Sequence, residues 1–159
     1  MAWPEPVQRV TTVLRGAAVD SNVQEFPEGT LTAQDAATAI GCDLREIVKS
    51  IVFVCEGSYI LALVPGDRRA DEAKVAAAAG VTAVRIASAE EVMAATGFEP
   101  GAVAPFPQRA IWHAFIERTL LQYKKVWIGA GSPMHMAALA PSDLQRLALA
   151  QPADLAARR

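Results

Sequence analysis

The strongest constraint on the fold comes from two apolar runs in the middle of the chain. They are IVKSIVFV at residues 47–54 and YILALV at residues 59–64. Both are rich in β-branched or aromatic residues, which favour strands. Glu56-Gly57 lies between them, and a short connection that contains glycine is typical of a β-hairpin. The sequence therefore predicts a pair of adjacent antiparallel strands.

Helices and further strands are expected on both sides of this hairpin. Apolar residues at helical spacing predict a helix at residues 6–17. Helix-capping residues predict four more, at 32–41, 71–80, 88–96 and from Pro141 onward. Short apolar segments predict strands at 22–26, 81–87, 111–116, 125–129 and, last in the chain, 136–140, with a helical turn at 117–121. Because this order does not repeat regularly, we expect one mixed sheet with flanking helices and not a doubly wound fold.

The segment 97–110 is unusual because it is both apolar and rich in turn-forming residues. It contains two glycines and three prolines but few polar residues, and we expect it to form an apolar loop on the surface. Trp112 and Trp127 fall on predicted strands and are expected in the core.

The composition is that of one folded domain over residues 1–159. The chain is 52% hydrophobic and 20% charged, which is far from the composition of disordered proteins. No apolar run approaches the ~20 residues that a membrane span needs, and the start, MAWPEPVQRV, does not resemble a secretory signal. The formal net charge of −2 argues against a protein that coats nucleic acid, although it allows a local basic patch.

The two cysteines and the acidic residues give no sign of a metal site. Cys42 and Cys55 have a spacing that fits neither a zinc site nor a redox motif. We expect reduced thiols in a cytoplasmic protein, with Cys55 in the core. The chain has no HxxxH, HExxH or CxxC pattern, and we expect neither a metal nor a cofactor.

Lys49 stands out because it lies inside the first apolar run, beside Ser50. Side chains alternate along a strand, so Lys49 shares a face with Ile51 and Phe53. In one interpretation, the lysine lays its methylene groups on apolar surface and extends its ammonium to water. In the other, the ammonium lies at the mouth of a cleft, where it attracts a carbonyl, a phosphate or a developing oxyanion. The residues alone leave both interpretations open.

Two glycine-containing loops are candidates for the walls of such a cleft. Gly101 and Pro105 form a G-x-x-x-P pattern, in which glycine lets backbone N–H groups approach a ligand and proline stiffens the loop. The same pattern also occurs in ordinary turns. Residues 129–133, GAGSP, lack the lysine of a phosphate-binding P-loop. We interpret them as a tight turn whose amides line a pocket.

A serine nucleophile is disfavoured by the spacing of the titratable residues. Ser50 and Ser132 would each need a nearby histidine, and the chain has only His113 and His135. No acidic partner for either histidine is evident from the spacing. Neither cysteine is a better candidate for a nucleophile.

Four segments of the chain occur in the order and at the spacing of a known family. They are TAQDAATAIGCDLREIVKSIVF, LALVPGDRRAD, EEVMAATGFEPGAVAPF and VWIGAGSP. Together they resemble the YbaK/prolyl-tRNA synthetase-associated editing domain family, over residues from about 7 to 150. The resemblance implies an α/β fold of the α+β type, with a mixed, largely antiparallel, curved sheet flanked by helices. It also implies an aminoacyl-tRNA deacylase, which hydrolyses the ester between a wrong amino acid and a tRNA, most often tRNA for proline.

The resemblance assigns Lys49 to the family's functional lysine, at the mouth of an aminoacyl pocket, where its charge would hold the phosphate or ester end of the substrate. The adjacent Ser50 is expected to contact the substrate. Gly101 and Pro105 match the family's GxxxP loop, whose backbone holds the 3′-terminal adenosine and its aminoacyl ester. The residues between them that are expected to bind substrate are Ala102 and Val103.

The glycine-rich loop on the other side of the pocket contains Gly131 and Ser132. After its glycines, members of the family often carry polar or charged residues, whereas this chain has PMHM at 133–136. Within that segment His135 is the one titratable group, and we expect it to bind substrate. The amino acid that is removed stays open among alanine, cysteine, serine, threonine and non-protein analogues.

An aminoacyl ester is already activated, so a positioned water and backbone N–H groups that stabilise the oxyanion would suffice for hydrolysis.

The expected partners are mischarged tRNA, bound at its acceptor end, and prolyl-tRNA synthetase, with the chain as a free-standing, trans-acting editor. Two other classes stay open: a silent module that binds tRNA or a synthetase, and a small esterase of acyl groups unrelated to tRNA. The pairs Arg68-Arg69 and Lys124-Lys125 would serve the silent module equally well.

Overall fold

The computed structural model describes residues 3–19, 21–106 and 110–158. Its helices are α1 (Glu5–Gly16), α2 (Ala33–Ile40), α3 (Glu72–Ala79), α4 (Ala89–Thr96) and α5 (Pro141–Ala148), with 3-10 turns η1 (Leu44–Glu46) and η2 (Arg118–Gln122). The strands are β1 (Asn22–Glu25), β2 (Val48–Cys55), β3 (Ser58–Pro65), β4 (Arg85–Ile86), β5 (Ile111–Glu117), β6 (Val126–Gly129), β7 (His135–Leu139) and β8 (Ala150–Ala153). The fold is of the mixed α/β class that the sequence predicts.

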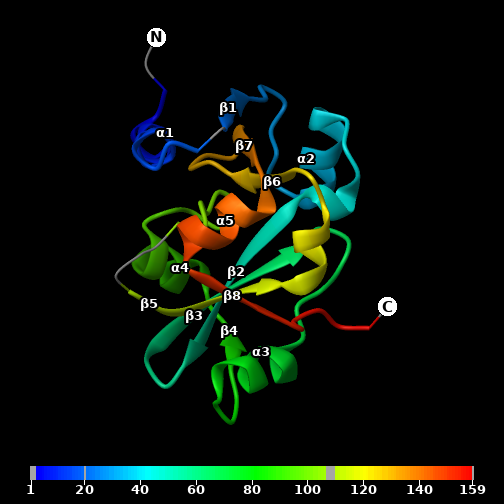
Figure 1. The fold of residues 1–159 in the computed structure, drawn as a ribbon. Coiled ribbons are helices and arrows are strands. Elements are labelled where there is room, and N and C mark those ends of the chain that lie inside the picture. Colours follow the sequence, from blue (N-terminus) through cyan, green and yellow to red (C-terminus); the bar gives the residue numbers. More distant parts are fainter. Residues whose placement is uncertain (1–2, 20, 107–109, 159) are drawn as a thin grey trace.

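The strands form two sheets, where the sequence predicts one. The larger sheet has the order β4-β2-β3-β5-β8, and the smaller has the order β1-β7-β6. Four of the strand pairs are antiparallel, and the two that involve β5 are parallel. A parallel bridge between Ile47 and Trp127 joins the sheets, and Figure 1 shows the smaller sheet at the end of the larger one where β2 begins.

Local capping groups set the ends of the short helices, as the sequence predicts. The Thr32 hydroxyl accepts a hydrogen bond from the Asp35 N–H at 3.0 Å, and α2 ends at Gly41 with a left-handed backbone. Ser88 and Glu91 form a capping box at the start of α4. These helices are only eight residues long, so their stability depends on such caps and on packing.

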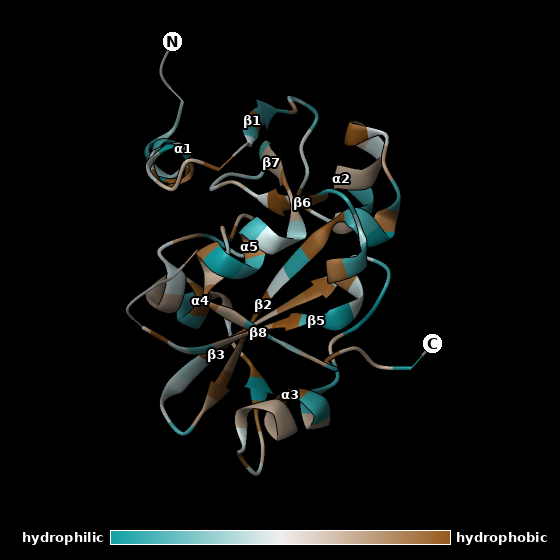
Figure 2. Cartoon of the chain, in the orientation of Figure 1, coloured by the Kyte–Doolittle hydropathy of each residue, from teal (hydrophilic) through white to brown (hydrophobic). Residues whose placement is uncertain are grey.

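The alternation of side chains along β2 separates two hydrophobic clusters. Val48 and Val52 pack into the larger cluster, together with residues of α1 and α5. Phe53 points to the other face and packs in a second cluster with Val75 of α3. Figure 2 shows that the central strands are mostly hydrophobic. Lys49 therefore lies on the face of Phe53, and Ser50 lies on the face of Val48 and Val52.

The expectation of an apolar surface loop at 97–110 is wrong for Phe98 and for residues 102–106, whereas Gly97, residues 99–101 and Ala110 are exposed as expected. Residues 102–106 are all buried, with Phe106 4% exposed, while residues 107–109 lie outside the described parts. The loop crosses the larger hydrophobic cluster, so its apolar side chains fill the core. Trp112 also differs from expectation, because its side chain is 50% exposed, whereas Trp127 is buried as predicted.

At the edges of the larger sheet one predicted strand is much shorter than expected and one strand was not predicted. The strand predicted at 81–87 is limited to Arg85 and Ile86, which pair with one end of β2. The chain also does not end its regular structure with α5, because β8 follows and pairs in parallel with β5. AQPA has little strand propensity, so this pairing depends on the tertiary contact with β5.

Gly101 is required by its backbone and by a close neighbour. Its φ angle is +83°, and a Cβ atom there would lie 3.0 Å from Leu31 Cδ1 and 3.1 Å from the Leu31 carbonyl oxygen. Gly41 has nearly the same φ, +81°, but a Cβ atom there would have no neighbour within 4 Å. The two glycines therefore differ in crowding and not in backbone conformation.

We predict that Gly101→Ala lowers the free energy of unfolding more than Gly41→Ala does. Both variants incur the cost of about 1–2 kcal/mol for a left-handed alanine, and Gly101→Ala adds a steric cost of about 1 kcal/mol or more. Urea denaturation of the two variants measures the difference. Equal destabilisation would show that Leu31 yields without cost.

Glu117 ties the end of β5 to the C-terminal segment. Its carboxylate accepts hydrogen bonds from the backbone N–H groups of Thr119 (2.8 Å), Leu155 (2.9 Å) and Ala156 (3.2 Å). Burial raises the pKa of this carboxyl, but the three backbone hydrogen bonds outweigh burial and hold the pKa below its ordinary value. The charged form of Glu117 therefore stabilises the fold.

We predict that Glu117→Gln lowers the free energy of unfolding by about 1–3 kcal/mol at neutral pH, because two charge-assisted bonds or more are weakened. A carboxyl whose pKa is lower in the folded state stabilises above its unfolded pKa, about 4.3, and this stabilisation is lost as the pH falls through the folded pKa. The variant should lose less stability on acidification than the wild type. Glu56→Gln, at an exposed hairpin position, is the matched control. Parallel pH profiles for wild type and Glu117→Gln would contradict the prediction.

Candidate functional site

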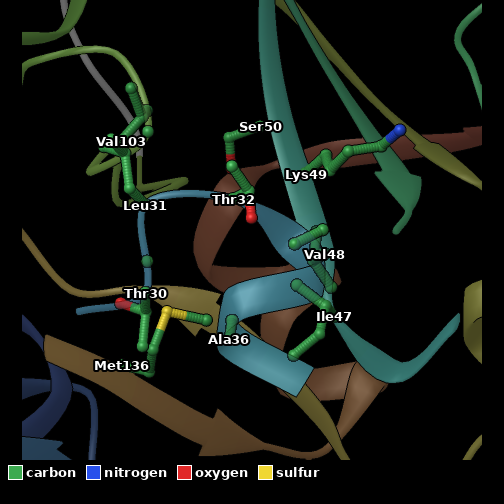
Figure 3. A pocket seen from close by; sticks show the side chains of 13 residues that line it. Thr30, Leu31, Thr32, Ala36, Ile47, Val48, Lys49, Ser50, Val103 and Met136 are labelled. Carbon is green, nitrogen blue, oxygen red and sulfur yellow. The ribbon is translucent and has the colours of Figure 1, made fainter. Parts of the chain in front are cut away.

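A cavity of about 340 Å³ lies where the two sheets meet, beside the start of β2. Its wall is made by the segment before α2, by α2 itself, by β2 and by the two glycine-containing loops. The lining residues are Thr30, Leu31, Thr32, Ala33, Ala36, Ile47, Val48, Lys49, Ser50, Gly101, Val103, Gly129 and Met136. Figure 3 shows Ser50 and Thr32 on one side of the strand and Leu31 next to Val103 on the rim.

The edge of β2 is open at Ser50. On the edge that faces away from β3, the Val52 carbonyl accepts a hydrogen bond from the Ala87 N–H at 2.9 Å. At the start of the strand, Ile47 bridges to Trp127 of β6. Residues two apart in a strand direct their backbone groups to the same side, so the Ser50 N–H and C=O face this edge between the two neighbours. A ligand in the cavity can reach both groups.

The Ser50 hydroxyl is a second polar group of this opening. Its Oγ is buried and has no hydrogen-bond partner among the described residues. Buried polar groups in folded proteins nearly always have a partner, and the exceptions mark water or ligand positions. This unpaired hydroxyl belongs to a residue that lines the cavity, which makes Ser50 a candidate ligand-binding residue.

Lys49 lines the cavity, but its ammonium lies elsewhere. Figure 3 shows the side chain running away from Ser50 and Thr32, and the Nζ atom donates a hydrogen bond to the Arg68 carbonyl. Burial lowers the pKa of the ammonium, the negative charge of Asp67 raises it, and Arg69 lowers it, with a net fall from the ordinary value. The lysine is half-buried beside the cavity and bound to backbone.

The rim of the cavity is fixed by hydrogen bonds between loops. Both the N–H and the hydroxyl of Thr30 donate to the Pro133 carbonyl, at 2.6 and 2.9 Å. Gly129 must be glycine, because a Cβ atom there would lie 2.9 Å from the Val103 carbonyl oxygen. The Gly131 N–H also donates to the Ala102 carbonyl at 3.1 Å. The cavity is thus pre-formed by its own loops.

The second glycine-rich loop contains a buried serine–histidine pair. Ser132 Oγ lies 2.5 Å from His135 Nδ1, and the Met134 N–H donates to the same oxygen at 3.0 Å. His135 Nε2 lies 3.4 Å from Glu25 Oε2. Burial lowers the pKa of His135, and the Glu25 charge opposes this, with a net fall. A neutral imidazole therefore accepts at Nδ1 from the serine hydroxyl and directs its Nε2–H toward Glu25.

Glu25 is the acidic partner that spacing alone does not reveal. It lies directly opposite His135 in the pairing of β1 with β7, and only a correct prediction of that register could have found it. The three side chains resemble a nucleophilic triad in composition, but Ser132 is 9% exposed and does not line the 340 Å³ cavity. The ring of Trp3 packs on His135 with centroids 5.1 Å apart. This cluster fixes the loop behind the cavity wall.

The cavity brings together four of the nine residues expected at the site, namely Lys49, Ser50, Gly101 and Val103. The other five are buried and do not line the cavity, namely Ala102, Pro105, Gly131, Ser132 and His135. The wall formed by residues 30–33 and Ala36 was not predicted from the sequence. The local signal there was the N-cap Thr32, which determines where α2 begins but not its position beside β2.

Two kinds of feature are missing from the parts of the chain that the structure describes. Within them, no three acidic, histidine or cysteine side chains are grouped so as to hold a metal ion. No helix within the same ranges has the length and apolar character needed to cross a membrane.

Comparison with known proteins connects this geometry to a family. The family model of the aminoacyl-tRNA editing domain matches residues 27–147. The match includes every residue that lines the cavity, from Thr30 to Met136. A crystal structure of a protein provisionally described as a trans-editing enzyme for prolyl-tRNA synthetase superimposes with a TM-score of 0.90 and 35% identity, over 99% of this chain and 100% of the other.

Two curated relatives show different extents of similarity. YwhH of Bacillus subtilis, an uncharacterised protein, is 30% identical over 83% of this chain and 84% of its own length. The proline–tRNA ligase of Xanthomonas oryzae pv. oryzae is 35% identical over 57% of this chain, and this chain spans only 16% of the ligase. The match of the family model over most of the fold, including the whole cavity, shows that the chain belongs to the aminoacyl-tRNA editing domain family.

Proposed function

We propose that the protein is a trans-acting editing hydrolase that deacylates mischarged aminoacyl-tRNA, with tRNA for proline as its main substrate. The observation that carries the proposal is the opening at Ser50, where a buried hydroxyl without a partner and two backbone groups face a pre-formed cavity. This opening lies inside the segment that matches the editing-domain model. The similarity to part of a proline–tRNA ligase supports the choice of tRNA.

The cavity supplies polar groups for hydrolysis of an ester without a strong nucleophile. In our proposal the aminoacyl ester lies against the Ser50 edge, and the Ser50 hydroxyl orients a water for attack on the ester carbonyl. The backbone N–H of Ser50 then donates to the oxyanion that develops on the carbonyl oxygen. Collapse of this intermediate breaks the bond between the carbonyl carbon and the ribose oxygen, and the ribose oxygen leaves as a hydroxyl with a proton from the attacking water. Val103 and Met136 close the space around the amino-acid side chain.

Lys49 is assigned to the phosphate of the terminal nucleotide. Its ammonium donates to the Arg68 carbonyl, which uses one of three N–H donors. The remaining N–H donors of the ammonium can bind a phosphate oxygen that approaches on the face of β2 where the Lys49 side chain lies. Partial burial makes such a contact stronger than it would be in water.

The expected partners follow from this role. The protein would bind the acceptor end of mischarged tRNA in the cytoplasm, and the net charge of −2 leaves little general attraction for the rest of the tRNA. Prolyl-tRNA synthetase could supply the remaining affinity by holding the tRNA near the editing protein.

A panel of mischarged tRNAs tests the proposal. The full chain is incubated with tRNA for proline and with one unrelated tRNA, each charged with alanine, cysteine, serine or threonine, and release of the amino acid is followed over time. We expect release of at least one amino acid from tRNA for proline, faster than in buffer. Binding without release from any substrate would contradict a hydrolase and would favour a silent tRNA-binding module.

We predict that Lys49→Ala lowers the rate of deacylation at least tenfold while the protein stays folded. The variant removes a half-buried cation, together with its hydrogen bond to the Arg68 carbonyl and its attraction to Asp67. Lys49→Met, which keeps the length and apolar character of the side chain, should be equally impaired. Single-turnover deacylation and circular dichroism give the two readouts. Wild-type rates with either folded variant would exclude the role assigned to the ammonium.

We predict opposite effects of Ser50→Ala on activity and on stability. The free energy of unfolding should stay the same or rise by about 1 kcal/mol, because the lost hydroxyl is buried without a partner. The rate of deacylation should fall at least tenfold. Ser132→Ala is the matched comparison for stability, because that hydroxyl has two partners and its loss should destabilise. A Ser50→Ala protein that is destabilised and fully active would contradict the proposal.

A further inference from the structure

The C-terminal residues 155–157 pair with residues 69–71, in the loop after β3, as a short antiparallel ribbon. At one end the Ala157 N–H donates a hydrogen bond to the Arg69 carbonyl at 2.7 Å, and a second backbone hydrogen bond of 2.8 Å joins the two segments at the other end. The C-terminal half of this ribbon lies outside residues 27–147, which match the family model. The loop after β3 is therefore fixed by a part of the chain that the family match does not include.

Two charged side chains hold the C-terminal half of the ribbon in place. The carboxylate of Glu117, at the end of β5, accepts hydrogen bonds from two of its backbone N–H groups. The ammonium of Lys74, in α3, donates to the Ala156 carbonyl at 2.8 Å and to the Asp154 carboxylate at 3.0 Å. Hydrogen bonds to charged groups are stronger than those between neutral groups. The ribbon is thus bound firmly to β5 and to α3.

Arg68 connects this ribbon to Lys49. Its guanidinium makes two hydrogen bonds to the Ala157 carbonyl, 2.5 Å long from Nη2 and 3.2 Å long from Nε. Its own carbonyl accepts a hydrogen bond from the Lys49 ammonium. The Arg68 N–H also donates to the Pro65 carbonyl at 3.1 Å, which closes the turn after β3. The residue that receives the ammonium is therefore held through both its side chain and its backbone.

We propose that Arg68 is a positioning residue for Lys49, and that the C-terminal residues 155–157 act on the lysine through it. A lysine ammonium is carried on a flexible four-carbon chain, so a half-buried lysine needs a fixed acceptor to keep one orientation. The Arg68 carbonyl is such an acceptor, and it leaves two N–H donors of the ammonium for the substrate phosphate. Because the phosphate contact belongs to the proposed function, this inference rests on that function.

A direct contact between the Arg68 guanidinium and a tRNA phosphate fits the geometry less well. Two of its nitrogens donate to the Ala157 carbonyl, and the residue is partly buried. The adjacent Arg69 is exposed and is better placed to meet a large ligand. Arg69→Ala is therefore the matched control, because it removes the same charge one position away and leaves the hydrogen bonds between Arg68 and Ala157 intact.

The NMR signal of the Lys49 ammonium tests the positioning role without a substrate. The full chain is isotope-labelled and kept at mildly acidic pH, where a hydrogen-bonded ammonium exchanges its hydrogens with water slowly. Loss of a signal in Lys49→Met identifies the Lys49 ammonium. We expect Arg68→Ala to speed its exchange at least fivefold, and Arg68→Lys, which keeps a donor for Ala157, to have a smaller effect. Arg69→Ala should exchange like the wild type. The backbone amide spectrum reports whether each variant is folded.

A double-mutant cycle of deacylation rates tests the consequence for the reaction. Arg68→Ala should lower the single-turnover rate at least fivefold in the wild-type background. It should leave the rate of Lys49→Met unchanged, because that variant has no ammonium to position. A fall by the same factor in both backgrounds would show that Arg68 acts on the tRNA directly and would overturn the positioning role.

The two readouts separate this inference from the proposed function. Equal exchange of the Lys49 ammonium in the wild type and in folded Arg68→Ala would overturn the positioning role even if the protein deacylates tRNA. A wild-type protein without a slowly exchanging Lys49 signal would overturn it as well. Faster exchange in Arg68→Ala but not in Arg69→Ala would support it, even if the protein releases no amino acid from any tRNA of the panel.

Discussion

The hydrogen-bonded edge of β2 is the feature on which the candidate site depends. Near the start of the strand this edge meets β6 through Ile47 and Trp127, and farther along it meets the segment after β4 through Val52 and Ala87. Ser50 lies between these neighbours. Each of them ends its contact with β2 before reaching Ser50, so the backbone there is left for a ligand. Because neither β6 nor the segment after β4 pairs with the whole edge of β2, the backbone at Ser50 stays unpaired, whereas a complete sheet would cover it.

The loops close around this opening because two positions favour glycine. Because Gly129 has no side chain, the Val103 carbonyl can pack directly against its Cα atom. Gly101 has a left-handed backbone and packs closely against Leu31. The loops are also joined by backbone hydrogen bonds, from Gly131 to Ala102 and from Thr30 to Pro133. The loops are therefore joined to one another before a ligand binds, which reduces the entropy that would be lost in ordering the site.

Local signals allowed much of the fold to be predicted from the sequence. The hairpin around Glu56-Gly57 and the caps at Thr32 and Ser88 depend on residues close in the chain, and the structure confirms them. The errors arise where distant segments meet. Strand β8 forms because β5 is beside it. Trp112 is 50% exposed although it lies in a strand, because burial of a side chain depends on which distant segments cover its face of the sheet.

The site residues also divide into those that local sequence patterns reveal and those that depend on contacts between distant segments. Lys49 and Ser50 are evident in the sequence because polar residues are unusual within an apolar strand. Their orientation could not be predicted, since it depends on the Arg68 carbonyl for one and on the gap between β6 and β4 for the other. The link between Glu25 and His135 depends on the register of β1 with β7, which no short-range pattern determines.

A crystal structure with a non-hydrolysable aminoacyl-adenosine, in which an amide replaces the ester, tests most directly whether the Ser50 opening is the substrate site. The position of the amide relative to Ser50 is the measured quantity. We expect the amide to lie within hydrogen-bonding distance of the Ser50 hydroxyl or backbone N–H, inside the 340 Å³ cavity. An analogue bound beside Ser132 and His135, with its amide away from Ser50, would contradict this assignment.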